Sequence, residues 1–159
     1  MAQIAGRAKN RAVSRFVTVA RLLGMSRNDS LGRTWLTAAV LTHLAVSIVH
    51  GRAHAGADVP LSYAANLFVF IVILAGPLIG LALLWPAQRI GSWVIAVTMA
   101  ASLVFGIVNH FVLPGPDHVT HVDAPWRTLF ATTAVLLAAT EAFASRLAIR
   151  WITERTSPS

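Results

Sequence analysis

The chain has no cysteine among its 159 residues. This absence excludes disulfides, thiolate metal sites, iron–sulfur clusters and thiol redox chemistry. Charged residues are also scarce, at 12%, whereas a soluble domain contains about a quarter. Any site must therefore be built from histidine, carboxylate and neutral polar groups, in surroundings where charge is costly.

Apolar residues fill the rest of the chain. They make up 56% of it, and the mean hydropathy is +0.67. Several apolar runs approach about twenty residues, the length that an α-helix needs to cross a bilayer. The composition predicts an all-α, polytopic integral membrane protein, a four-transmembrane-helix bundle, whose partner is the lipid bilayer and whose location is a bacterial inner membrane. The predicted spans are about 34–51, 61–85, 90–113 and 126–149, between a basic arm (1–33) and a polar tail (150–159).

The arm carries most of the positive charge, and Asp29 is its one acidic residue. Val13, Phe16 and Val17 fall at helical spacing, which favours an amphipathic helix on an anionic membrane surface. A disordered basic tail that only sets orientation is the alternative. The net charge of +7 could indicate nucleic acid, but the positive residues lie in the arm and in short loops. We therefore expect no nucleic-acid partner.

The arginines also predict the orientation of the spans. With both termini cytoplasmic, eleven of the thirteen Lys and Arg residues lie inside, and only Arg52 and Arg127 lie outside. This asymmetry follows the positive-inside rule over all four spans. The tryptophans agree, because they fall near span ends, where aromatic belts lie. Four are expected at the inner boundary and one at the outer: Trp35, Trp85, Trp93 and Trp151, then Trp126.

Glycine and proline residues predict where spans begin, end or bend. Gly51 is expected to end the first helix, whereas Pro60 precedes the second. Within the second, Gly76-Pro77 predicts a kink, because proline has no N–H for the carbonyl one turn back. Gly76 and Gly80 form a small surface that suits close helix packing. That surface could serve the bundle itself or a homo-oligomer.

The most polar stretch lies between the last two spans. Residues 109–123 hold three histidines and two aspartates, and the predicted topology brings the end of the first span to the same side. Neutral imidazole with carboxylate suits zinc, nickel, copper or iron. The aspartates could be ligands or could orient the imidazole rings. The candidate metal ligands are His50, His54, His110, Asp117, His118, His121 and Asp123.

Three polar residues are predicted inside the membrane: His43, Asn66 and Glu141. Polar groups at this depth must face the bundle interior, because lipid cannot satisfy them. The third span adds a small, polar stripe with a four-residue repeat. Together these faces predict a polar pocket that opens outward. His43 and Glu141 could relay protons or cations, or could only make structural contacts across the bundle.

One short string resembles a known signature. His110 with Gly115-Pro116-Asp117-His118 resembles the His…Gly-x-Asp-His motif of small nickel and cobalt permeases. The resemblance implies a metal held by polar residues of membrane helices. It covers only residues 110–118, and here the prolines place the motif in a loop rather than within a helix.

The sequence supports several functions. The first is an outward-facing site that binds a transition metal, linked to transport or sensing, with a metal ion or small molecule arriving from the outer side. The second is a b-type haem or quinone redox protein, in which His50 and His110 would be axial haem ligands. The third is a metal-dependent membrane enzyme, and the fourth a non-catalytic accessory protein.

Overall fold

A computed structural model describes residues 27–154. The chain divides into two units, Met1–Thr34 and Trp35–Ser159, and the buried core lies within the second. The predicted interfacial helix and the final residues of the polar tail lie outside the described residues. The described residues form helices and no strand: α2 (Arg27–Gly56), α3 (Tyr63–Phe68), η1 (Val69–Ala75), α4 (Gly76–Leu83), α5 (Gln88–Ile107), η2 (Val108–Val112) and α6 (Ala124–Glu154), where η marks a π-helix.

Four helical runs are long and apolar enough to cross a membrane, which confirms the predicted all-helical fold and the number of membrane-compatible helices among the described residues. The shortest has 21 residues and the longest 31. At about 1.5 Å per residue, even the shortest reaches the roughly 30 Å of a bilayer core. The cytoplasmic placement of both termini stays a prediction. The runs are Ser30–Gly56, Tyr63–Leu83, Gln88–Val112 and Ala124–Glu154.

The predicted end of the first helix at Gly51 is wrong, because α2 continues to Gly56. A glycine inside a helix costs only about 1 kcal/mol relative to alanine, which continued hydrogen bonding can offset. Ala53, in the extra turn, is fully buried against Val122 and Phe130. The longer helix carries His54 one turn beyond His50, on the same face.

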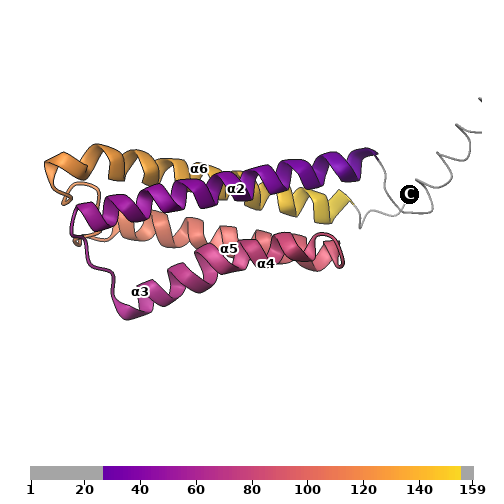
Figure 1. Cartoon of the computed structure of the whole chain (residues 1–159), viewed down its shortest axis with the longest axis horizontal. Coiled ribbons are helices and arrows are strands. Elements are labelled where there is room, and N and C mark those ends of the chain that lie inside the picture. The colour runs from indigo at the N-terminus through magenta and orange to yellow at the C-terminus, as the bar shows by residue number, and fades with distance from the viewer. Residues whose placement is uncertain (1–26, 155–159) are drawn as a thin grey trace, which may run out of the picture. The chain divides into compact units, whose positions relative to one another are not determined.

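Apolar packing holds the four spans together and leaves many large side chains outside. Leu36 and Val40 of α2, Ile95 and Met99 of α5, and Trp151 of α6 belong to one buried core. Figure 1 shows the spans running along one another, with α3 directed away from α2. Large apolar side chains such as Ile48 are exposed on the outside of the bundle, where a membrane protein meets lipid.

The small residues of the second span pack inside this bundle. A methyl group added at Gly80 would overlap Ile95 of α5, and one added at Gly91 would overlap the backbone of Gly80. Gly76 similarly lies against Thr98. Close approach of α4 and α5 therefore requires glycine at these positions. This face serves the bundle's own packing, while a homo-oligomer stays a prediction.

Candidate metal centre

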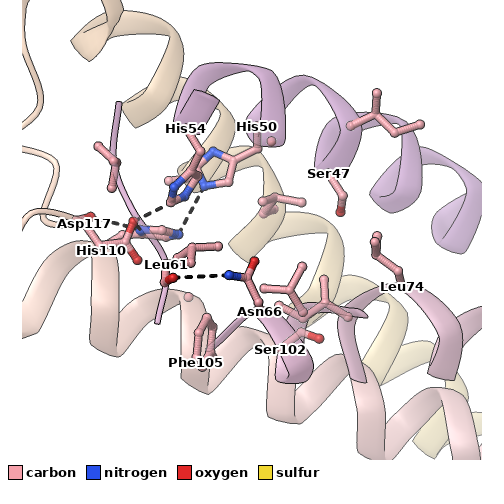
Figure 2. Close-up of a pocket in the computed structure, with 18 of the residues that line it drawn as sticks. Ser47, His50, His54, Leu61, Asn66, Leu74, Ser102, Phe105, His110 and Asp117 are labelled. Carbon is pink, nitrogen blue, oxygen red and sulfur yellow. Dashed lines mark hydrogen bonds and ion pairs between the residues drawn. The ribbon is translucent and has the colours of Figure 1, made fainter. Parts of the chain in front are cut away.

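Three histidines converge at the end of the bundle where α2 finishes. His50 and His54 lie one turn apart on α2, and His110 lies on η2. One ligand atom from each ring lies within 4.8 Å of the others, so the three could hold a metal ion. Figure 2 shows the rings turned toward one another beside Asp117. Of the seven candidate ligands, these four residues form one cluster.

Nδ1 of His50 is held by the hydroxyl of Thr133, 2.8 Å away. The same hydroxyl can donate to the carbonyl of Leu129, at 2.7 Å. When it does, it accepts from Nδ1–H of His50, and Nε2 of the neutral ring holds the lone pair. When it donates to Nδ1 instead, Nε2 carries the hydrogen. In both tautomers Nε2 of His50 faces His110.

His110 is held in the same way. Its Nδ1 lies 3.1 Å from the backbone carbonyl of Asp117 and 3.3 Å from Oδ1 of that carboxylate. Both oxygens accept, so Nδ1 donates and Nε2 carries the lone pair. This Nε2 lies 3.2 Å from Nε2 of His50. The two Nε2 atoms can share the hydrogen of His50 in a hydrogen bond or, where both hold lone pairs, bind a cation between them.

The spacing suits a metal ion. Metal–imidazole bonds of about 2.0–2.1 Å at a tetrahedral angle put two nitrogens about 3.3–3.4 Å apart. The distance of 3.2 Å between the Nε2 atoms of His50 and His110 is close to that value. Little movement of the two rings is therefore needed to place an ion between them.

His54 offers a third ligand. Its Nε2 lies 3.2 Å from Oδ1 of Asp117, which favours the proton on this nitrogen. Its Nδ1 is buried near the backbone of Val59. One nitrogen of the His54 ring lies within 4.8 Å of ligand atoms of His50 and His110, so this ring can complete a set of three imidazole ligands.

Asp117 serves two rings at once. It is half-buried, and its Oδ1 faces both His54 and His110. Burial alone would raise the pKa of this carboxyl. The hydrogen bond from His110 and the positive charges that the neighbouring histidines can carry outweigh burial and lower the pKa below its ordinary value. The side chain is thus held as a carboxylate, in the position that orients metal-binding imidazoles in other sites.

Apolar groups and the following loop enclose the cluster. The ring of Phe130 lies 4.8 Å from that of His50, 4.7 Å from that of His54 and 5.2 Å from that of His110, centre to centre. The loop is tied to η2 because the Val119 N–H donates to the carbonyl of His110. A π-helical turn leaves such carbonyls off the usual ladder and is frequent at functional sites.

The remaining predicted ligands lie elsewhere. His118 bonds through Nδ1 to the hydroxyl of Thr120, and Nδ1 of exposed His121 donates to the carbonyl of Gly115. The backbone carbonyl of Asp123 accepts from the first turn of α6, and its side chain is exposed. The structure does not bring these three residues to the cluster.

A cavity of about 460 Å³ continues from the histidines into the bundle. His50, His54, His110 and Asp117 form one end of its lining, and Glu141 contributes farther along α6. Asn66 also lines it and donates to the carbonyl of Leu61. A pocket is thus present beside the predicted residues, but most of its wall is apolar rather than polar.

A second polar cluster lies deeper, between His43 and Glu141. Nε2 of His43 lies 3.2 Å from the carbonyl oxygen of Ile73, whose usual helical donor, four residues on, would be Pro77. Because the carbonyl only accepts, Nε2 donates and Nδ1 holds the lone pair. This Nδ1 lies 3.6 Å from Oε1 of Glu141, and both side chains are almost fully buried. The two intramembrane groups are therefore paired with each other.

Sequence reasoning missed two residues at the centre, Phe130 and Thr133. Both belong to the buried stripe of α6 that also holds Leu137 and Glu141. The three- and four-residue spacing of that stripe was the available signal. A threonine in an apolar helix more often bonds its own backbone, as Thr133 also does, so nothing local marked it as a partner of His50.

Comparisons with known proteins identify no relative. No protein-family model, no curated protein and no solved structure matches the chain. The likeness to the permease signature thus stays confined to residues 110–118. Function must be inferred from the chain's own residues.

Proposed function

We propose that this protein binds a transition metal ion through His50, His54 and His110 at one end of its membrane-spanning bundle. One observation carries the proposal. The Nε2 atoms of His50 and His110 face each other at 3.2 Å, and each ring is held by a partner on its far nitrogen. A metal ion can bind both nitrogens, and one nitrogen of His54 lies within 4.8 Å of ligand atoms of both rings.

The three imidazole ligands restrict which metal ions are expected to bind. Three imidazole nitrogens without thiolate suit zinc, copper(II), nickel(II) or iron(II) better than magnesium or calcium, which prefer oxygen. Asp117 supplies the carboxylate that commonly accepts the other N–H of a metal-bound histidine. Three protein ligands leave a coordination position for an exogenous group, as in sites that bind or activate small molecules.

The same distances do not favour haem. In a bis-histidine haem the iron lies in line between two nitrogens, which at about 2.0 Å per bond puts them about 4 Å apart. Those of His50 and His110 are 3.2 Å apart. Their ring centres are 4.9 Å apart, and Phe130 packs against both rings. A single ion fits this space better than a porphyrin between the rings.

Metal transport is the second candidate, and the His43–Glu141 pair favours it. A carboxyl group deep in a membrane is expensive and often belongs to an ion or proton path. The cavity connects this acid with the histidine cluster. However, the wall between them is mostly apolar and offers a hydrated ion few ligands. The geometry therefore supports metal binding more directly than passage, and leaves sensing or catalysis as uses of the bound ion.

Metal content tests the proposal. The full chain, purified in lipid nanodiscs, is loaded with zinc, desalted and measured by elemental mass spectrometry. We expect one ion per chain, and less than a tenth of that in a His50→Ala/His110→Ala variant. His118→Ala/His121→Ala is the matched control, because it removes two histidines outside the cluster. No stoichiometric metal in wild type, or equal loss in both variants, would overturn the proposal.

A further inference from the structure

The cavity beside the histidines opens through the side of the bundle. Ile48 of α2 and Phe70 of η1 both line it, yet they are 69% and 64% exposed. Ile48 lies eight residues before the end of α2 and Phe70 seven residues after the start of α3. At 1.5 Å per residue, both lie roughly 10 Å inside their spans. This part of the opening therefore lies at the depth of the membrane hydrocarbon, and exposed Gly51 and Ala55 continue the opening toward the end of α2.

The wall of the cavity offers few hydrogen-bonding groups to a polar ligand. Ile73, Leu74, Phe105 and Leu137 are among its side chains. Ser47 and Ser102 donate their hydroxyl hydrogens to the carbonyls of His43 and Thr98. Asn66 donates one of its two amide hydrogens to the carbonyl of Leu61. The binding free energy of a molecule that fills this cavity therefore comes mainly from burying its hydrocarbon surface.

The two ends of the cavity differ in chemistry. At one end lie the three histidines, whose metal ion would have a coordination position left for an oxygen donor. From there the lining extends along α6 from Ala134 to Glu141, seven residues or about 10 Å. The volume of about 460 Å³ lies within the roughly 300–1,000 Å³ range of small-molecule sites.

Resting on the proposed metal site, we infer that the cavity binds a single-chain lipid. Its oxygen headgroup, a carboxylate or hydroxyl, occupies the remaining position on the metal, and its hydrocarbon tail fills the apolar space. The side opening lets the lipid enter from the bilayer. A single chain fits better than a bulk diacyl lipid, because the second tail would have to lie outside the cavity.

Photo-crosslinking tests the inference in the intact protein. Zinc-loaded protein in nanodiscs is exposed to a long-chain fatty acid bearing a diazirine on its tail, and labelled peptides are mapped by mass spectrometry. A diazirine-labelled phosphatidylcholine serves as the bulk-lipid probe. Ala138→Phe fills the cavity, whereas Ala139→Phe places the same ring on the neighbouring, exposed position of α6. Ala138→Met fills less space should Ala138→Phe fail to fold.

We expect the fatty acid to label cavity residues such as Leu74 and Phe105, and the phosphatidylcholine to label only outward-facing positions. Cavity labelling should fall at least fivefold in the Ala138 variant and stay unchanged in Ala139→Phe. It should also fall at least threefold when a chelator removes the metal. Equal labelling in the two variants overturns the tail site, and labelling that ignores the chelator overturns the metal-bound headgroup.

Metal content of the same samples separates this inference from the proposed function. Ala138→Phe should keep the wild-type zinc content, since it leaves the three histidines intact. Protein that binds zinc but gives no cavity labelling overturns the lipid site and supports the metal site. Protein that is labelled in the cavity but holds no zinc overturns both the metal site and the headgroup placement.

Discussion

The protein contains two buried histidine sites of different character. In the cluster nearer the end of the bundle, here called the outer cluster, the Nε2 atoms of His50 and His110 face each other, 3.2 Å apart. In the deeper pair, the acceptor nitrogen of His43 faces the carboxyl of Glu141, which can itself hold the proton between them, at 3.6 Å. The outer cluster therefore offers imidazole nitrogens to an added cation, whereas the deeper site pairs a histidine with an acid.

The contrast shows that the far nitrogen of a histidine decides what the near nitrogen can do. His50 and His110 are turned into ligands by Thr133 and Asp117. His43 is anchored by a backbone carbonyl that Pro77 leaves without its usual donor. In both sites the far nitrogen of each ring has a hydrogen-bonding partner, but the near nitrogens face different groups. Variants of the two sites should differ in zinc affinity if this contrast holds.

The largest effect should separate His110 from His43. His110→Ala removes one of the two facing lone pairs, so we expect zinc affinity to fall at least a hundredfold. His43→Gln should change it less than about threefold, because His43 lies outside the outer cluster. Competition titration against a chromophoric chelator measures both. Similar losses in the two variants would erase the distinction between the clusters.

Asp117 should have the next largest effect on the outer cluster. Replacing the carboxylate that orients metal-bound histidines typically costs ten- to a hundredfold in metal affinity. We expect Asp117→Asn to fall in this range, because its side chain faces both His54 and His110. The exposed Asp123→Asn is the control and should bind zinc as wild type does. Normal affinity in Asp117→Asn would show that the rings need no orienting carboxylate.

The lowered pKa of Asp117 also predicts how acid affects the metal-free protein. Its carboxylate stabilises the fold above its ordinary pKa of about 3.8. That contribution is lost as the pH falls through the still lower pKa of the folded state. Thermal unfolding should therefore show a smaller advantage of wild type over Asp117→Asn below pH 3.8 than at pH 6. A constant difference between the two proteins over this range would contradict the assignment.

Thr133 should have the smallest effect. Thr133→Val keeps the shape of the side chain but removes the acceptor for Nδ1–H of His50. The ring stays in place but loses this hydrogen bond, so zinc affinity should fall only several-fold. Thr132→Val, on an exposed neighbouring position, is the matched control. The same titration applies, and a loss as large as that of His110→Ala would assign Thr133 a ligand's role instead.

Helical periodicity explains how much of this could be read from sequence. His43, Ser47, His50 and His54 recur every three or four residues, so a common inward face followed from spacing alone. The four spans followed from length and hydropathy. The prediction that the first helix ends at Gly51 was wrong because glycine is only weakly unfavourable inside a helix, and burial of Ala53 favours the extra turn.

The loop could not be read in this way. His118 and His121 have a spacing that would put them together on a helix, but residues 113–123 are not helical. Local bonds to Thr120 and Gly115 decide where these rings point. Nothing in the sequence distinguishes Asp117 from Asp123 as a partner of the histidines. Only the fold of the loop places Asp117 against His54 and His110.

X-ray absorption at the zinc edge tests the metal site most directly. Spectra of zinc-loaded protein in nanodiscs should show four nitrogen or oxygen neighbours at about 2.0–2.1 Å. The outer-shell scattering of imidazole should correspond to three histidines, and to fewer in His54→Ala. Zinc surrounded only by oxygen, or an imidazole signal that His54→Ala leaves unchanged, would contradict a three-histidine centre.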